Sequence, residues 1–145
     1  MSTQSLRYQI SAAIVQALST APALAGAVVL DHPKAPSDLS KGTRVIFVED
    51  QADDLIDQPN QQAKRSFSFA VGVINRTAQD RAGADADHLA AFAAIRERHQ
   101  TALVKNLGCG PLRELGVRFK VEGLDVGGAL ILASYAVEYR KERQA

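Results

Sequence analysis

The chain has one cysteine, Cys109, no tryptophan and five prolines among its 145 residues. A single cysteine excludes an intrachain disulfide and cannot supply the several thiolates of a structural zinc site. No apolar run approaches the roughly 18 residues that a membrane-spanning helix needs, and no basic segment with an apolar signal core opens the chain. We therefore expect a fold held by packing, made in the cytoplasm, without a membrane partner.

Charge of one sign is also lacking, because 17 basic and 16 acidic residues leave a formal net charge of +1. That balance argues against the strong phosphate-directed field of most dedicated nucleic-acid binders, so no direct nucleic-acid partner is expected. The 145 residues, 46% of them hydrophobic, suit one domain with a real core and are too few for two comfortable ones. The prediction is a single domain over residues 1–145.

Two helices are predicted from apolar spacings of three and four residues. The first carries Leu6, Ile10 and Ile14; Ser2, Thr3 or Ser5 would cap it, and Pro22 would stop it. The second is expected to start at a cap formed by Asp85 or Asp87 and to run to about residue 107, with Gly108 as its C-terminal cap.

Strands are predicted at residues 25–30, 43–49, 66–75, 117–122 and 129–139. In the third of them, bulky side chains from Phe67 to Val73 alternate with small ones. The bulky face should meet a helix, and the small face permits close approach of a neighbouring layer or subunit. The order helix, three strands, helix, two strands predicts an α+β fold, a mainly antiparallel sheet of about five strands with two helices on one face.

Residues 50–65 form a long polar segment between the second and third predicted strands, and we expect an extended loop arm there. The arm offers candidate contacts to another subunit or partner, namely Asp50, Asp53, Asp54, Leu55, Ile56, Asp57, Lys64 and Arg65. The alternatives are a solvated acidic loop, or a loose calcium or magnesium site that lacks the glycine and bidentate glutamate of a calcium-binding loop. The charged residues 140–145 are expected to fray.

Candidate chemistry is sparse in this sequence. His32, His88 and His99 show no metal-ligand spacing, so neither a metal nor another cofactor is expected. Cys109 follows a predicted helix C-terminus, where the dipole disfavours a thiolate. No combination of residues predicts catalysis, and we expect no enzyme. A basic sheet face that binds single-stranded RNA is the weaker alternative, built on Arg44, Arg65, Arg118 and Lys120.

The last predicted strand is apolar on both faces. Tyr135 and Tyr139 share one face with Ile131, Ala133 and Val137, whereas Leu130 and Leu132 lie on the other. A helix accounts for burial of one face only. A neighbouring subunit is therefore one explanation for how the second face is covered.

The helix opened by Leu6-Arg7-Tyr8-Gln9-Ile10 and the strands around residues 42–47 and 67–73 combine with an arm between the second and third strands and a closing hairpin over 117–139. This arrangement, over nearly the whole chain, resembles the tail terminator proteins of long-tailed bacteriophages and related minor tail proteins encoded in prophages. The resemblance implies a non-enzymatic protein that forms a ring of six copies, caps the tail tube and offers a surface to the head.

The resemblance also implies the partners and the location: other copies of the chain, the tail tube protein and a head-completion protein, met in the host cytoplasm and then in the virion tail. Rival hypotheses are another head-tail connector or neck protein, and a small nucleic-acid-binding α+β module. Under the tail hypothesis the arm contacts adjacent subunits or the tube.

Overall fold

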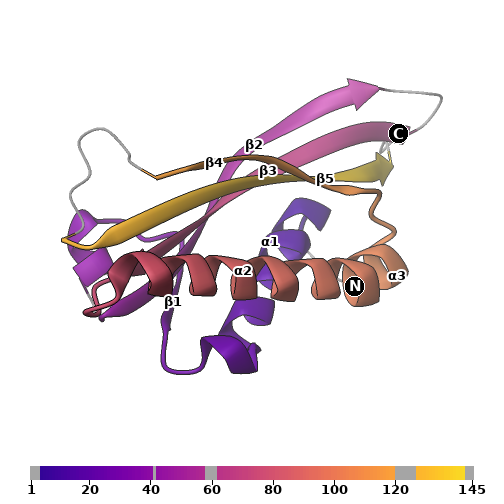
Figure 1. Cartoon of the computed structure of the whole chain (residues 1–145). Coiled ribbons are helices and arrows are strands. Elements are labelled where there is room, and N and C mark those ends of the chain that lie inside the picture. Colours follow the sequence, from indigo (N-terminus) through magenta and orange to yellow (C-terminus); the bar gives the residue numbers. More distant parts are fainter. Residues whose placement is uncertain (1–3, 41, 58–61, 120–126, 143–145) are drawn as a thin grey trace.

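The computed structural model describes residues 4–40, 42–57, 62–119 and 127–142. Along the chain its elements are α1 Leu6–Thr20, η1 Pro22–Leu24, β1 Val28–Asp31, η2 Pro36–Ser40, β2 Arg44–Asp57, β3 Gln62–Asn75, α2 Asp80–Arg98, the π-helical turn η3 His99–Leu103, α3 Val104–Leu107, β4 Leu112–Arg118 and β5 Ala129–Glu142. The long helices α1 and α2 lie on the same side of the sheet (Figure 1).

Within the described residues the strands form one five-stranded sheet in the order β1-β2-β3-β5-β4. β1 runs parallel to β2, and every other neighbouring pair is antiparallel. The predicted α+β class is therefore confirmed, with a sheet that is mixed at one edge. β4 begins earlier than expected, at Leu112, and residues 120–122 of the expected strand lie outside the described residues.

The predicted loop arm is wrong for most of its length, because β2 and β3 continue as strands through it. Both strands have 14 residues and pair from Arg44 with Asn75 to Asp57 with Lys64. Residues 58–61 of the expected arm lie outside the described residues. The distal part of this long hairpin projects past the helices at the upper right of Figure 1.

The C-terminal end also differs from the expected frayed segment. β5 continues to Glu142, and Arg140 pairs with Lys64 across the hairpin. The partner strand β3 supplies the hydrogen-bonding groups that keep the end of β5 extended. Residues 143–145 lie outside the described residues.

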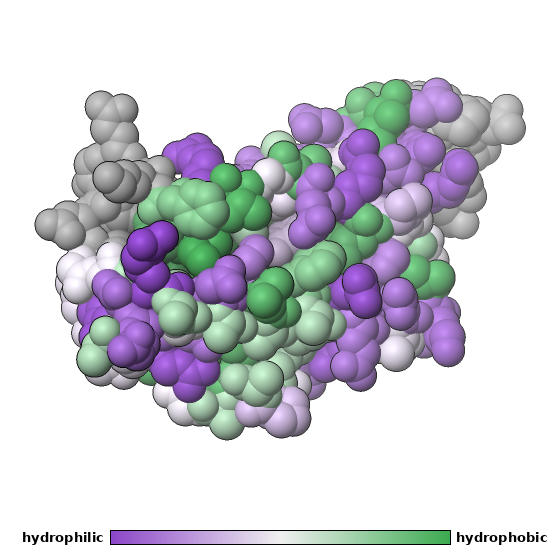
Figure 2. Space-filling view, viewed as in Figure 1, coloured by the Kyte–Doolittle hydropathy of each residue, from purple (hydrophilic) through white to green (hydrophobic). Residues whose placement is uncertain are grey.

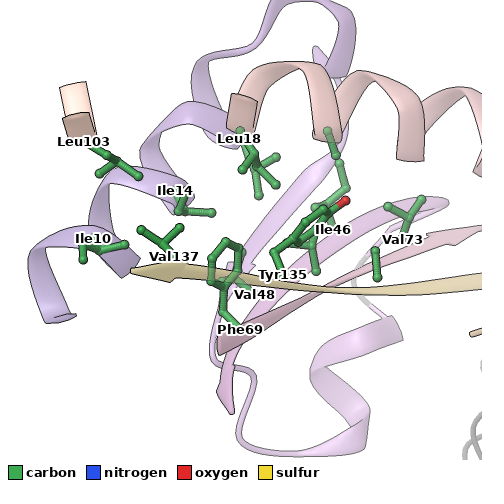
Figure 3. Packing of buried hydrophobic residues seen from close by; sticks show 14 of the residues in the cluster. Ile10, Ile14, Leu18, Ile46, Val48, Phe69, Val73, Leu103, Tyr135 and Val137 are labelled. Atoms are coloured by element: carbon green, nitrogen blue, oxygen red, sulfur yellow. The ribbon is translucent and has the colours of Figure 1, made fainter. Parts of the chain in front are cut away.

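The main core lies between the sheet and the two helices. Ile10, Ile14 and Leu18 of α1 point toward Ile46, Val48, Phe69, Tyr135 and Val137 of the sheet (Figure 3). The bulky face of β3 therefore meets the helices, as predicted. The ring centroids of Phe69 and Tyr135 are 5.6 Å apart, and those of Phe92 and Tyr135 are 5.8 Å apart, within the range of favourable aromatic pairs.

The opposite face of the sheet has a smaller core at one end, where η2 covers it. Leu39 packs with Val45, Phe47, Ile74 and Leu130. Gly72 is needed here because a Cβ atom on it would lie 2.1 Å from two carbons of the Phe47 ring. At Gly72 the small face of β3 therefore allows close approach of the Phe47 ring from the neighbouring strand β2, not of another layer.

Ser5 caps α1, since its hydroxyl accepts a hydrogen bond from the Tyr8 N–H at 3.1 Å. The expected caps of the second helix are wrong, because α2 begins earlier, at Asp80, with Gln79 as its N-cap. Asp87 is instead buried on the inner face of α2 and receives two hydrogen bonds from Arg44, at 2.8 and 3.1 Å. Gly108 ends α3 in the left-handed conformation, as predicted, with φ of 66°.

Candidate functional site

The eight predicted contact residues lie on the distal half of the β2–β3 hairpin, and the structure divides them between its two faces. On the helix face Asp50, Asp53 and Arg65 are held by hydrogen bonds. The exposed residues are Asp54, Leu55, Ile56 and Asp57. They remain candidates for contact with a partner, while the hydrogen bonds of Asp50, Asp53 and Arg65 stabilise the hairpin itself.

Asp53 is the centre of a polar cluster rather than a free contact residue. Its carboxylate accepts hydrogen bonds from the Tyr139 hydroxyl at 2.6 Å, from Arg65 Nε at 3.2 Å and from Arg7 Nη1 at 3.4 Å. Its side chain is only 12% exposed. Burial and the bond to Asp53 raise the pKa of Tyr139, so the phenol stays protonated and donates. The cluster joins α1, β2, β3 and β5 in the distal half of the hairpin, just before its exposed end.

Asp50 is held in a similar way at the edge of the sheet. Ser11 Oγ donates to Asp50 Oδ1 at 2.9 Å, and Nε2 of His32 lies 3.0 Å from the same oxygen. The other ring nitrogen of His32 contacts Asp31. Burial opposes protonation of His32, but its hydrogen bonds to Asp31 and Asp50 and their negative charges outweigh it and raise its pKa.

The protonation state of His32 decides whether its ring contacts the backbone N–H or the carboxylate of Asp50. The neutral ring accepts the Asp50 N–H at 2.9 Å, whereas the protonated ring faces the carboxylate. The pKa of His32 is higher in the folded chain than its value of about 6.5 in the unfolded chain. Protonated His32 therefore stabilises the fold fully at pH values below about 6.5, and this stabilisation is lost as the pH rises through the pKa of the folded chain.

The exposed part of the hairpin combines apolar and acidic side chains. Leu55 and Ile56 are 51% and 48% exposed, although both are large aliphatic residues. Asp54 lies on the face away from the helices, opposite Ser66 of β3. On that same face Lys64 Nζ lies 3.5 Å from a carboxylate oxygen of Glu138, so this predicted contact residue already has an ion pair.

The uncovered face of the sheet is lined by small side chains beyond η2. Ala52, Ser68 and Ala136 follow one another across β2, β3 and β5, and Ala70 and Ser134 form the next row. Charged residues border this strip on both sides. Glu49 and Asp54 stand on β2, and Arg113 and Arg118 stand on β4.

The β4 edge was missed by sequence reasoning as a contact surface. Leu115, Val117 and Phe119 are 52%, 40% and 68% exposed. Figure 2 shows apolar side chains gathered over the end of β4. The alternation of Val117 and Phe119 predicted a strand with one buried face. Only the strand order, with β4 outermost and α2 packed on β3 and β5, reveals that this face stays open.

The alternative basic RNA-binding face does not form from the three arginines that the structure describes. Arg44 turns to Asp87 on the helix side, and Arg65 binds Asp53 on the same side. Arg118 pairs across from Leu132, on the other face of the sheet. Lys120 lies outside the described residues. The three described arginines are therefore spread over two faces.

The groups with potential chemistry are mostly buried or tied to neighbours. Burial raises the pKa of Cys109 to about 11, which keeps the thiol neutral near pH 7. His99 Nε2 lies 2.7 Å from the Gly110 carbonyl oxygen. Among the described residues no group of three or more His, Cys, Asp or Glu side chains could hold a metal ion. A hollow of about 310 Å³ between α1 and α2 is lined mostly by alanines.

Two comparisons with known proteins find no match for this chain. No family model matches it, and no curated protein matches it either. In the part of the chain that the structure describes, no helix has both the length and the apolar character needed to cross a membrane. The exposed end of the hairpin and the two edges of the sheet are therefore the features on which a function can be argued.

Proposed function

We propose that this chain is a structural protein of a phage or prophage tail, a tail terminator that forms a ring of six copies and caps the tail tube. The resemblance described above supplies the hypothesis. The observation that carries it is the β2–β3 hairpin, which projects past the helices and exposes Leu55 and Ile56 at its distal end (Figure 1).

A projecting hairpin with an apolar end suits contact with a second protein. Exposed aliphatic side chains on a monomer usually occur singly, whereas adjacent ones rimmed by charge mark interaction sites. The Asp53 cluster ties the distal half of the hairpin to α1 and β5, close to the exposed Leu55 and Ile56. In this proposal the hairpin end contacts the tail tube, and the remaining surface is free to meet other copies and the head-completion protein.

The test uses the purified chain and purified tail tubes from the genome that encodes it. Electron microscopy of the mixture should show a ring at one end of each tube. Replacing Leu55 and Ile56 by Asp should weaken binding to the tube by at least about tenfold, because two buried apolar contacts are replaced by charges. Both side chains are about half exposed in the isolated chain, so the fold should remain intact.

The matched control replaces Leu89 and Val104 by Asp. These residues are also exposed, at 59% and 42%, but they lie on α2 and α3. Their variant should bind tubes like the unaltered chain. Equal binding by the Leu55, Ile56 variant would remove the hairpin end from the tube contact, and tubes without end density would contradict the capping function.

A further inference from the structure

The sheet has two open edges of different character. β1 pairs with β2 only from Val45 to Val48, and His32 then accepts the Asp50 N–H, so among the described residues the outer edge of β2 is open from Gln51 onward. At the opposite edge, β4 pairs with β5 on one side and with no described strand on the other. Open strand edges present unpaired backbone N–H and C=O groups, which favour pairing with another strand.

Resting on the ring of the proposed function, we propose that β4 of one copy docks antiparallel against the outer edge of β2 in the next copy, along residues 51–54 and beside Glu49. Repeating the sheet side by side gives this orientation, because β2 and β4 run in opposite directions within one chain. The surfaces that meet are different, so the contact is head-to-tail and either closes into a ring or grows into a filament.

The charges of the two edges are complementary on the face away from the helices. Glu49 and Asp54 are exposed on β2, and Arg113 and Arg118 are exposed on β4. Of the side-chain hydrogen bonds and ion pairs found among the described residues, none involves these four groups. Opposite charges placed across an interface steer association and fix its register.

The spacing of the charges matches as well. Glu49 and Asp54 pair with Ala70 and Ser66, which are four residues apart on β3. Arg113 and Arg118 pair with Ala136 and Leu132, which are also four residues apart on β5. Because Ala136 and Leu132 in turn pair with Ser68 and Gly72, the acidic and basic pairs are staggered by only two residues. If the sheet of the next copy is shifted by two residues along the strands, Arg113 lies opposite Asp54 and Arg118 lies opposite Glu49.

The helix-side face of the same edges offers apolar surface. Val117 stands exposed on β4, and the exposed Phe119 follows its last residue. The antiparallel contact would cover part of this area, which the helices leave open. Bulges at Asp50/Ala52 and at Glu114/Gly116 interrupt both ladders, so side chains rather than backbone groups alone select the partner edge.

The test is a charge swap between two variants. One variant carries Arg113→Glu with Arg118→Glu, and the other carries Glu49→Arg with Asp54→Arg. Each variant alone places like charges across every interface and should need at least about tenfold more protein to assemble than the unaltered chain. In an equimolar mixture every interface is again complementary, so assemblies of the original mass should return in sedimentation velocity.

The control carries Arg81→Glu with Lys105→Glu, two exposed cations that lie on the helices α2 and α3 rather than on either edge strand, and should assemble normally. Three outcomes would overturn the interface: an unaltered chain that stays monomeric at high concentration, single variants that assemble normally, or a mixture that stays monomeric. The experiment contains no tail tubes. Tube capping is measured separately, by the electron-microscopy test described under the proposed function. If the charge swap fails but the unaltered chain caps tubes, this interface alone is rejected. If the swap restores assembly but the chain caps no tube, the tail function alone is rejected.

Discussion

Replacing Asp87 by Ala should lower the free energy of unfolding by about 3 kcal/mol, because it leaves the partly buried Arg44 guanidinium without its carboxylate. Asp87 is 8% exposed at its side chain and Arg44 is 26% exposed, and two hydrogen bonds of 2.8 and 3.1 Å join them. Asn75 Nδ2 also approaches Asp87, at 3.5 Å. The pair ties the start of β2 to the inner face of α2.

Urea unfolding followed by circular dichroism measures this effect. Asp85→Ala is the matched control, because Asp85 is exposed on the same helix and should change stability by no more than about 0.5 kcal/mol. An Asp87→Ala midpoint equal to that of Asp85→Ala would show that the pair contributes nothing to stability. Asp87→Asn keeps the shape and removes the charge, so it separates packing from electrostatics.

Replacing Gly72 by Ala should cost about 2 kcal/mol, even though removing a glycine ordinarily stabilises a strand through the unfolded state. The new methyl group would lie 2.1 Å from the Phe47 ring. That ring is 4% exposed and packs in the small core under η2, so it has little room to move away.

A second substitution identifies the cause. In a chain that carries Phe47→Leu, the smaller side chain leaves room for the methyl group, and Gly72→Ala should cost at least about 1 kcal/mol less. Ser134→Ala, on the same face of the sheet, should be close to neutral and serves as the control. Strictly additive effects of the two substitutions in thermal or urea unfolding would contradict the close approach of Phe47 to Gly72.

Local patterns were sufficient to predict the elements that pack on the main core. The four-residue spacing of Leu6, Ile10 and Ile14 predicted α1, and the alternation from Phe67 to Val73 predicted β3 and its buried face. These patterns are visible in the sequence because α1 and β3 each have one apolar face, and both faces pack into the main core. The α+β class followed from their order along the chain.

The errors came where distant residues decide the local structure. Residues 50–57 lack the alternation of a strand, yet they are extended because β3 pairs with them and Asp53 bonds to Tyr139, 86 positions away. Asp87 resembled a helix cap, but its partner Arg44 lies 43 positions earlier. The open edge at β4 depends on the strand order, which composition and periodicity do not encode.

The central claim is tested most directly by locating the chain in particles induced from the genome that encodes it. Gold-labelled antibodies raised against the purified chain would be applied to intact particles and to isolated tails, and the labelled ends counted by electron microscopy. Label should be confined to the head-proximal end of each tail, and quantitative mass spectrometry should give six copies per tail. Label along the tube, at the distal tip or on the capsid, or particles that lack the chain, would contradict it.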